Sequence, residues 1–257
     1  MIPLKLLIDR NLETLALRAE AVVRTETVHW GPHTLKNDVH GYRAKELPKD
    51  EWPRRQIEAF PTIAKMAREC QLTFCTSVEL KFESFKATRG WQGSIGDLFR
   101  DIKYENVRSA VERSYFWQTT DLSKYSSGEG QVGWYKEFLL KVDEQQLLEE
   151  IKGHIDLPEF DKQNLAKLNR FRDICRYLDT GDHIRDAFHL WTAEVNGLDY
   201  FLTADKSFTN KMTKSTPLEL PTPPISPADL LVTLGRTDID PLPLANQRFR
   251  YLFEPES

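Results

Sequence analysis

The order of hydrophobic and polar positions predicts short strands that alternate with helices. Continuous apolar runs of strand length lie at Leu4–Ile8, Leu72–Thr76 and Tyr200–Thr203. Apolar residues at helical spacing predict helices over Arg54–Glu69, Glu79–Phe85, Asp161–Asp179 and Asp186–Glu194. This alternation is typical of an α/β fold with a central, mostly parallel sheet flanked by helices.

Three segments interrupt this pattern. Pro61 is expected to kink or delay the helix that contains it. β-Branched residues on both sides of Gly31-Pro32 predict a hairpin or an irregular excursion over Ala21–Val39. The polar stretch Thr119–Gly133 is interpreted as a loop. Its GxGxxG spacing follows polar residues instead of a hydrophobic strand, so no dinucleotide cofactor is expected there.

Length and composition favour one large globular domain with insertions. The chain has 257 residues, of which 40% are hydrophobic and 29% charged. No apolar run approaches the roughly 18 residues that cross a bilayer, and the first acid comes too early for a signal peptide. Cys70, Cys75 and Cys175 show no CxxC spacing and fit reduced thiols. A cytoplasmic protein without membrane contact is therefore expected.

The formal net charge of −4 argues against a protein that coats nucleic acid but leaves room for a local site. Asp9 and Asp205 follow two of the predicted strands. Ligands of open α/β sheets bind outside the carboxyl ends of the strands, where converging carboxylates repel one another unless a proton or cation intervenes. Oxygen ligands favour Mg²⁺ or Mn²⁺ as that cation.

The residues around these acids resemble the PIN-domain family of metal-dependent nucleases. The resemblance covers Leu4–Asn11 and Arg185–Leu234, and extends in part to Leu72–Phe85. In that family a strand delivers the first Asp, a helix after a second strand supplies a Glu, and a late helix and strand supply two further Asp residues. The resemblance implies a PIN-like three-layer fold. The implied catalytic and metal-binding residues are Asp9, Glu79, Asp186 and Asp205.

The resemblance also implies supporting residues around the four acids. Asn11 and Thr203 would orient the carboxylates or the scissile phosphate, and Lys206 would neutralise a phosphate oxygen. The Glu position is ambiguous, because Glu83 lies one helical turn after Glu79. Asp182 either adds a ligand or caps the helix that carries Asp186.

Alternatives stay open for each of these side chains. An acid at a strand end, in a first helical turn, on the surface or in an Asx-turn is common without any metal. His29, His33 and His40 lack the pattern that would complete a zinc site. His183 and His189 are expected to be structural.

The predicted domain covers residues 1–234, with insertions at about 24–50 and 90–155 and a C-terminal tail at 235–257. The insertions would form a substrate lid or a partner surface.

The predicted activity is that of an endoribonuclease, which hydrolyses RNA while one or two metal ions stabilise the attacking and leaving oxygens. Single-stranded DNA is an alternative substrate. The chain would be the toxin or effector of a toxin–antitoxin or antiphage system, with an antitoxin, another protein or a second copy as partner. The alternative function is a non-catalytic PIN-like module that binds RNA or protein. Phosphatases of the haloacid dehalogenase type are a weaker match, since they need an Asp where Asn11 stands.

Overall fold

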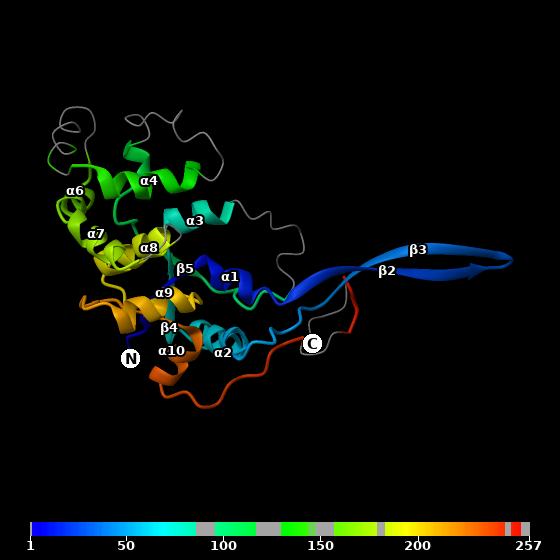
Figure 1. Ribbon diagram of the computed structural model, residues 1–257. Coiled ribbons are helices and arrows are strands. Elements are labelled where there is room, and N and C mark those ends of the chain that lie inside the picture. The colour runs from blue at the N-terminus through cyan, green and yellow to red at the C-terminus, as the bar shows by residue number, and fades with distance from the viewer. Residues whose placement is uncertain are drawn as a thin grey trace. The chain divides into compact units, whose positions relative to one another are not determined.

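A computed structural model describes residues 2–85, 96–116, 130–143, 145, 147, 157–178, 183–244 and 248–252 (Figure 1). The chain forms two compact units, each assembled from three chain segments. The first unit contains Met1–Arg10, Gln71–Ala87 and Lys103–Ser226, and the second contains Asn11–Cys70, Thr88–Ile102 and Pro227–Ser257. The predicted domain at 1–234, its two insertions and its tail stay predictions.

The first unit is built on a five-stranded sheet with the order β5-β4-β1-β6-β7, in which every pairing is parallel. Its strands are β1 (Leu4–Ile8), β4 (Leu72–Thr76), β5 (Tyr104–Asn106), β6 (Tyr200–Leu202) and β7 (Pro224–Ile225). The three apolar runs chosen from the sequence are therefore strands, and they are adjacent in space. The predicted α/β class with a mostly parallel sheet is confirmed.

Helices of the first unit pack on this sheet through an aromatic core. They are α3 (Val78–Phe85), η2 (Arg113–Phe116), α4 (Gly130–Lys141), α6 (Glu159–Leu165), α7 (Leu168–Arg176), α8 (His183–Val195), α9 (Lys206–Asn210) and η4 (Lys211–Ser215). Phe171 of α7 stacks on Trp191 of α8 with ring centroids 5.5 Å apart. Leu7 of β1 and Phe201 of β6 belong to the same buried cluster, so this face of the sheet and the helices share one core.

The predicted single helix over Asp161–Asp179 is wrong, because the structure divides it into α6 and α7. Lys167, between them, has a φ of −112° and a ψ of 20°, outside the helical region. Asn164 is buried and donates its amide to the backbone oxygen of Ala110 at 2.6 Å. A buried polar contact of this kind fixes the direction of α6 independently of the apolar stripe on α7, and apolar periodicity does not register it.

Pro61 does not delay the helix that contains it. Helix α2 (Glu51–Arg68) begins ten residues earlier and continues through Pro61. Its buried face includes Ile57, Phe60 and Ile63, so tertiary packing maintains the helix across the missing backbone donor.

The second unit combines helices with an antiparallel sheet. Its helices are α1 (Arg10–Ala16), α2 and α10 (Pro227–Thr233), and its strands are β2 (Ala19–Trp30), β3 (His33–Ala44) and β8 (Arg250–Tyr251) in the order β2-β3-β8. The predicted hairpin is thus present, with Gly31 at a φ of 58° in its turn. None of the helices in the described ranges is long and apolar enough to cross a membrane.

The tail after residue 235 contributes a strand to this sheet. Arg250 and Tyr251 of β8 pair with Tyr42 and Gly41 of β3. A Cβ atom at position 41 would lie 2.4 Å from the backbone oxygen of Arg250 and 2.4 Å from a ring atom of Phe249. Position 41 therefore needs glycine for the tail to approach.

We predict that Gly41→Ala displaces β8 from β3, because the added methyl group overlaps backbone that cannot yield without breaking the pairing. Limited trypsin digestion is expected to cleave after Arg250, which is buried in the wild type, about tenfold faster in the variant. Thr27→Ala, at an exposed position of the same hairpin, is the control. Equal cleavage of Gly41→Ala and wild type would contradict the prediction.

Candidate metal centre

The carboxyl ends of β1 and β6 bring Asp9 and Thr203 together. The Asp9 amide donates to the backbone oxygen of Leu202 at 2.9 Å, which continues the parallel pairing beyond the strands. The Thr203 hydroxyl donates to the Asp9 carboxylate at 2.5 Å and accepts from the Asp205 amide at 3.1 Å. Asp9 and Thr203 are both buried. One hydroxyl thus fixes the Asp9 carboxylate and the backbone that leads to Asp205.

Asp186 and Asp205 meet beside His183. His183 Nδ1 lies 3.5 Å from an Asp186 oxygen and 3.7 Å from an Asp205 oxygen. One ligand atom from each of the three side chains lies within 4.8 Å of the others, and no other trio of potential ligands in the described ranges is as close. The first turn of α8 supplies His183 and Asp186, and the loop after β6 supplies Asp205.

The surroundings of Asp186 disfavour its charged form. Burial, followed by the nearby carboxylates of Asp205 and Glu83, raises the pKa of Asp186 to about 7, although Lys136 and Arg185 act in the opposite direction. A carboxylate in this position is stabilised by a proton or by a bound cation. The side chains of His183, Asp186 and Asp205 are only partly buried, so an ion can reach them.

Glu83 belongs to a buried ion-pair network. Its carboxylate accepts from Lys136 Nζ at 2.8 Å and lies 3.2 Å from His189 Nε2. Burial alone would raise the pKa of Glu83, but His189 and Lys136 outweigh it and hold the pKa well below its usual range. Lys136 and His189 are themselves almost fully buried. Glu83 is therefore a charged group that already has two partners.

Glu79 lies one turn earlier on α3 and has a different partner. Arg113 Nε donates to Glu79 Oε1 at 2.7 Å, and Arg113 Nη2 donates to Glu79 Oε2. Both side chains are buried. A two-pronged pair with Arg gives each carboxylate oxygen a donor, so the charge of Glu79 is compensated within the fold.

The four acids predicted from the sequence are thus divided among three environments. The structure brings Asp186 and Asp205 together, connects Asp9 to Asp205 through Thr203, and places Glu79 on Arg113. Asp205 also caps α9, since its side chain accepts from the Phe208 amide at 2.8 Å.

The supporting residues lie as follows. Thr203 contacts Asp9, as described above. Lys206 is exposed at the first position of α9, and Asn11 lies on α1 in the second unit. Asp182 lies outside the described residues. The structural role predicted for His183 stays a prediction, and the structure places its ring beside both carboxylates. Its spacing of three residues from Asp186 on one helix is the signal in the sequence that identifies it.

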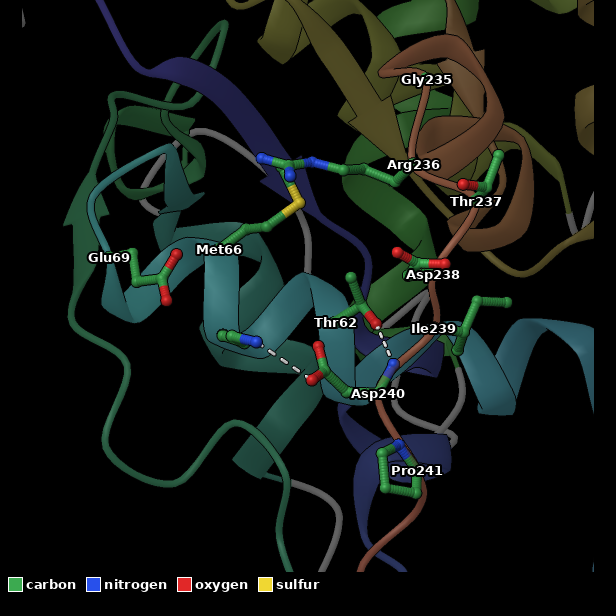
Figure 2. Close-up of a pocket in the computed structure, with 11 residues that line it drawn as sticks. Thr62, Met66, Glu69, Gly235, Arg236, Thr237, Asp238, Ile239, Asp240 and Pro241 are labelled. Atoms are coloured by element: carbon green, nitrogen blue, oxygen red, sulfur yellow. Dashed lines mark hydrogen bonds and ion pairs between the residues drawn. The ribbon is translucent and has the colours of Figure 1, made fainter.

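A separate pocket of about 400 Å³ lies in the second unit, between α2 and the segment that follows α10 (Figure 2). Its lining carries both signs of charge, including Lys65, Arg236, Asp238 and Asp240. Lys65 Nζ lies 3.1 Å from Asp240, and the Asp240 amide donates to the Thr62 hydroxyl at 2.7 Å (Figure 2). None of the residues predicted for the metal site lines this pocket.

Comparison with known proteins found no matching family model, curated protein or solved structure. The resemblance to PIN domains therefore stays a prediction from the sequence.

We predict that Glu79→Gln destabilises the protein by about 3–5 kcal/mol, because Arg113 loses the charge that compensates for its burial. Urea unfolding in EDTA measures the difference. Glu58→Gln, in an exposed pair with Arg54, is the control and is expected to change stability by less than about 0.5 kcal/mol. A gain of stability for Glu79→Gln would instead place this acid among mutually repelling carboxylates.

We predict that Asp186→Asn stabilises the metal-free protein at pH 8 but not at pH 4. The raised pKa of Asp186 contributes stability that is fully present below the pKa of the unfolded chain and is lost as pH rises through about 7. Asn resembles the neutral carboxyl group at every pH, so the variant avoids this loss, which has an upper limit of about 4 kcal/mol.

Urea unfolding in EDTA at the two pH values measures this difference. Asp173→Asn, on α7, is the control and is expected to change stability by less than about 0.5 kcal/mol at both pH values. An Asp186→Asn effect that is the same at pH 4 and pH 8 would contradict the assignment of the charge penalty to Asp186.

Proposed function

We propose that this protein is a metal-dependent nuclease, and in particular an endoribonuclease, with its metal held by Asp186, Asp205 and His183. The observation that carries the proposal is the approach of two partly buried carboxylates, one of them with a raised pKa, beside an imidazole at the carboxyl edge of a parallel sheet. Such a group gains most from a bound cation, because the cation offsets both the repulsion and the burial.

The donor set fits a divalent cation. The two carboxylates suit both Mg²⁺ and Mn²⁺. Because Mg²⁺ favours ligand shells made only of oxygen, the imidazole nitrogen of His183 favours Mn²⁺ over Mg²⁺. Binding requires neutral His183 and ionised Asp186, so affinity for the metal is expected to rise with pH.

A metal bound here would supply Lewis acidity toward a phosphodiester and its attacking water. Asp9, fixed by Thr203, would orient that water or a metal-bound group through its buried carboxylate. Lys206, exposed on the first turn of α9, would neutralise a phosphate oxygen of the substrate. The choice of RNA over single-stranded DNA rests on the resemblance of Leu4–Asn11 and Arg185–Leu234 to PIN domains. The proposed role as a toxin or antiphage effector with a protein partner rests on the same resemblance.

A second candidate function is a non-catalytic module that binds RNA or protein. It is supported by the structural partners that three of the acids already have. Glu79 is paired with Arg113, Glu83 with Lys136 and His189, and Asp205 with the Phe208 amide. Binding of RNA without cleavage, in the presence of Mn²⁺, would favour this function over the nuclease.

We predict that Asp205→Asn lowers Mn²⁺-dependent cleavage of a mixed-sequence single-stranded RNA at least about 100-fold while the fold remains intact. Asn is as good a helix cap as Asp, so the bond from the Phe208 amide survives, but the charge that binds the cation is lost. Cleavage of labelled RNA and of DNA of the same sequence is measured with Mn²⁺ and with EDTA. The shift of melting temperature caused by Mn²⁺ is measured alongside and is expected to disappear in the variant.

Asp199→Asn is the matched control, because Asp199 accepts from the Lys5 amide at 2.7 Å beside the amino end of β6. It is expected to cleave at the wild-type rate. Full activity of Asp205→Asn, or equal cleavage by the wild type in EDTA, would overturn the proposed metal site.

A further inference from the structure

The hairpin of β2 and β3 exposes a long strand edge. Figure 1 shows the two strands running side by side as a twisted ribbon. β8 pairs only with Gly41 and Tyr42 at the base of β3, and β2 is an edge strand of its sheet throughout its twelve residues. In the described part of the chain, no strand pairs with the outer side of β2. We call this side of Ala21–Trp30 the hairpin edge.

Solvent surrounds most of this ribbon. Val23, Val28, Trp30 and Leu35 are 58%, 45%, 76% and 53% exposed. A two-stranded ribbon with both faces in water is marginally stable, and a long edge with free backbone groups is a template for another strand.

The turn determines which backbone groups of the hairpin edge point outward. Trp30 and His33 flank the two-residue turn Gly31-Pro32, so they form a hydrogen-bonded pair. Even-numbered residues of β2 therefore bond to β3. The odd-numbered residues, which point their N–H and C=O groups outward, are Ala21, Val23, Thr25, Thr27 and His29. Another antiparallel strand has to align its own outward residues with these.

We propose that the hairpin edge pairs with the same edge of a second copy of this chain, antiparallel about a two-fold axis at Thr25. In this register Thr25 faces Thr25 of the second copy, and Arg24 faces Glu26 of the second copy. By symmetry Glu26 faces Arg24 of the second copy, so two opposite-charge pairs flank the axis. Val22 faces Val28 of the second copy on the same side of the sheet. Five outward residues from each chain supply about ten hydrogen bonds.

Charge selects this register over its neighbours. The nearest registers that keep the outward residues aligned have their two-fold axis at Arg24 or at Glu26 instead of Thr25. An axis at Arg24 places Arg24 opposite Arg24 of the second copy, and an axis at Glu26 places Glu26 opposite Glu26 of the second copy. Like charges directly opposite each other destabilise a strand pair, so both shifted registers are disfavoured. Within one chain, Arg24 Nε already donates to Glu26 at 3.0 Å, so the four side chains form an alternating group in the dimer.

The same hairpin is poorly suited to nucleic acid. Its acids, Glu20, Glu26 and Asp38, equal in number its strong bases, Arg24, Lys36 and Arg43. Binding to phosphates requires an excess of positive charge, which the hairpin lacks when its histidines are neutral. A self-complementary protein edge is the occupant that the balanced charges favour. The pairing does not depend on the proposed nuclease activity.

Analytical ultracentrifugation of the full chain tests the proposal. At tens of micromolar the wild type is expected to have the mass of two 29.9 kDa chains. Arg24→Glu and Glu26→Arg each place like charges across the axis, so each variant is expected to have the mass of one chain. An equimolar mixture of the two is expected to regain the dimer, because all the facing charges are then opposite. The double variant Arg24→Glu/Glu26→Arg is expected to dimerise by itself.

Two further variants separate the edge from other effects. Thr25→Pro removes an outward N–H without removing a backbone bond to β3, although the bond from the Thr25 hydroxyl to Asp38 of β3 is also lost, and it is expected to abolish the dimer. Arg54→Glu makes the same change of charge on α2 and is expected to leave the dimer unchanged. The melting temperature shows whether each variant remains folded, which matters because Arg24 and Glu26 also contact Tyr251.

Three outcomes would overturn the proposal. One is a wild type that stays monomeric up to about 100 µM. Another is a dimer that persists in Thr25→Pro. The third is a mixture of Arg24→Glu and Glu26→Arg that stays monomeric although both variants are folded. A monomeric wild type whose RNA binding falls in Arg24→Glu would assign the edge to nucleic acid instead.

Discussion

The parallel register between β1 and β6 is the constraint on which the candidate site depends. It aligns Ile8 with Leu202, so the residues that follow both strands leave the sheet at the same edge. Thr203 can then bond to Asp9 although 194 residues separate them in the sequence. A slip of one residue would turn the side chains of β6 to the opposite face of the sheet and remove this contact. The loop to Asp205 and the start of α9 depend on the same alignment.

The chain removes several carboxylates from water, and each has a different means of compensation. Glu79 has Arg113, and Glu83 has Lys136 with His189. For Asp186, burial and then the nearby carboxylates of Asp205 and Glu83 raise the pKa, and Lys136 and Arg185 offset this only in part. This contrast distinguishes acids that stabilise the fold in their charged form from an acid that is destabilised by its charge. Only the second kind gains substantially from a cation, which is why the proposed function rests on Asp186 and not on Glu79.

The two units contain two different kinds of incompletely compensated group. In the first unit it is a charge, at Asp186. In the described part of the second it is a row of backbone donors and acceptors along the hairpin edge, which contains Arg24 and Glu26. A cation satisfies the first, and another strand satisfies the second. Because the two features lie on separate units and need different partners, the metal site and the dimer can be tested independently of each other.

The sequence by itself determined the α/β class, the strands β1, β4 and β6, and the hairpin, because apolar runs and turn residues act locally. It also indicated the acids at the strand ends. Only the tertiary structure decided which acids share an environment, because a carboxylate's partner is set by contacts between distant segments. The pairing of Arg113 with Glu79 and the bond from the buried Asn164 of α6 to Ala110 are such contacts. Apolar periodicity carries no record of them, since one buried polar bond leaves the hydrophobic pattern unchanged.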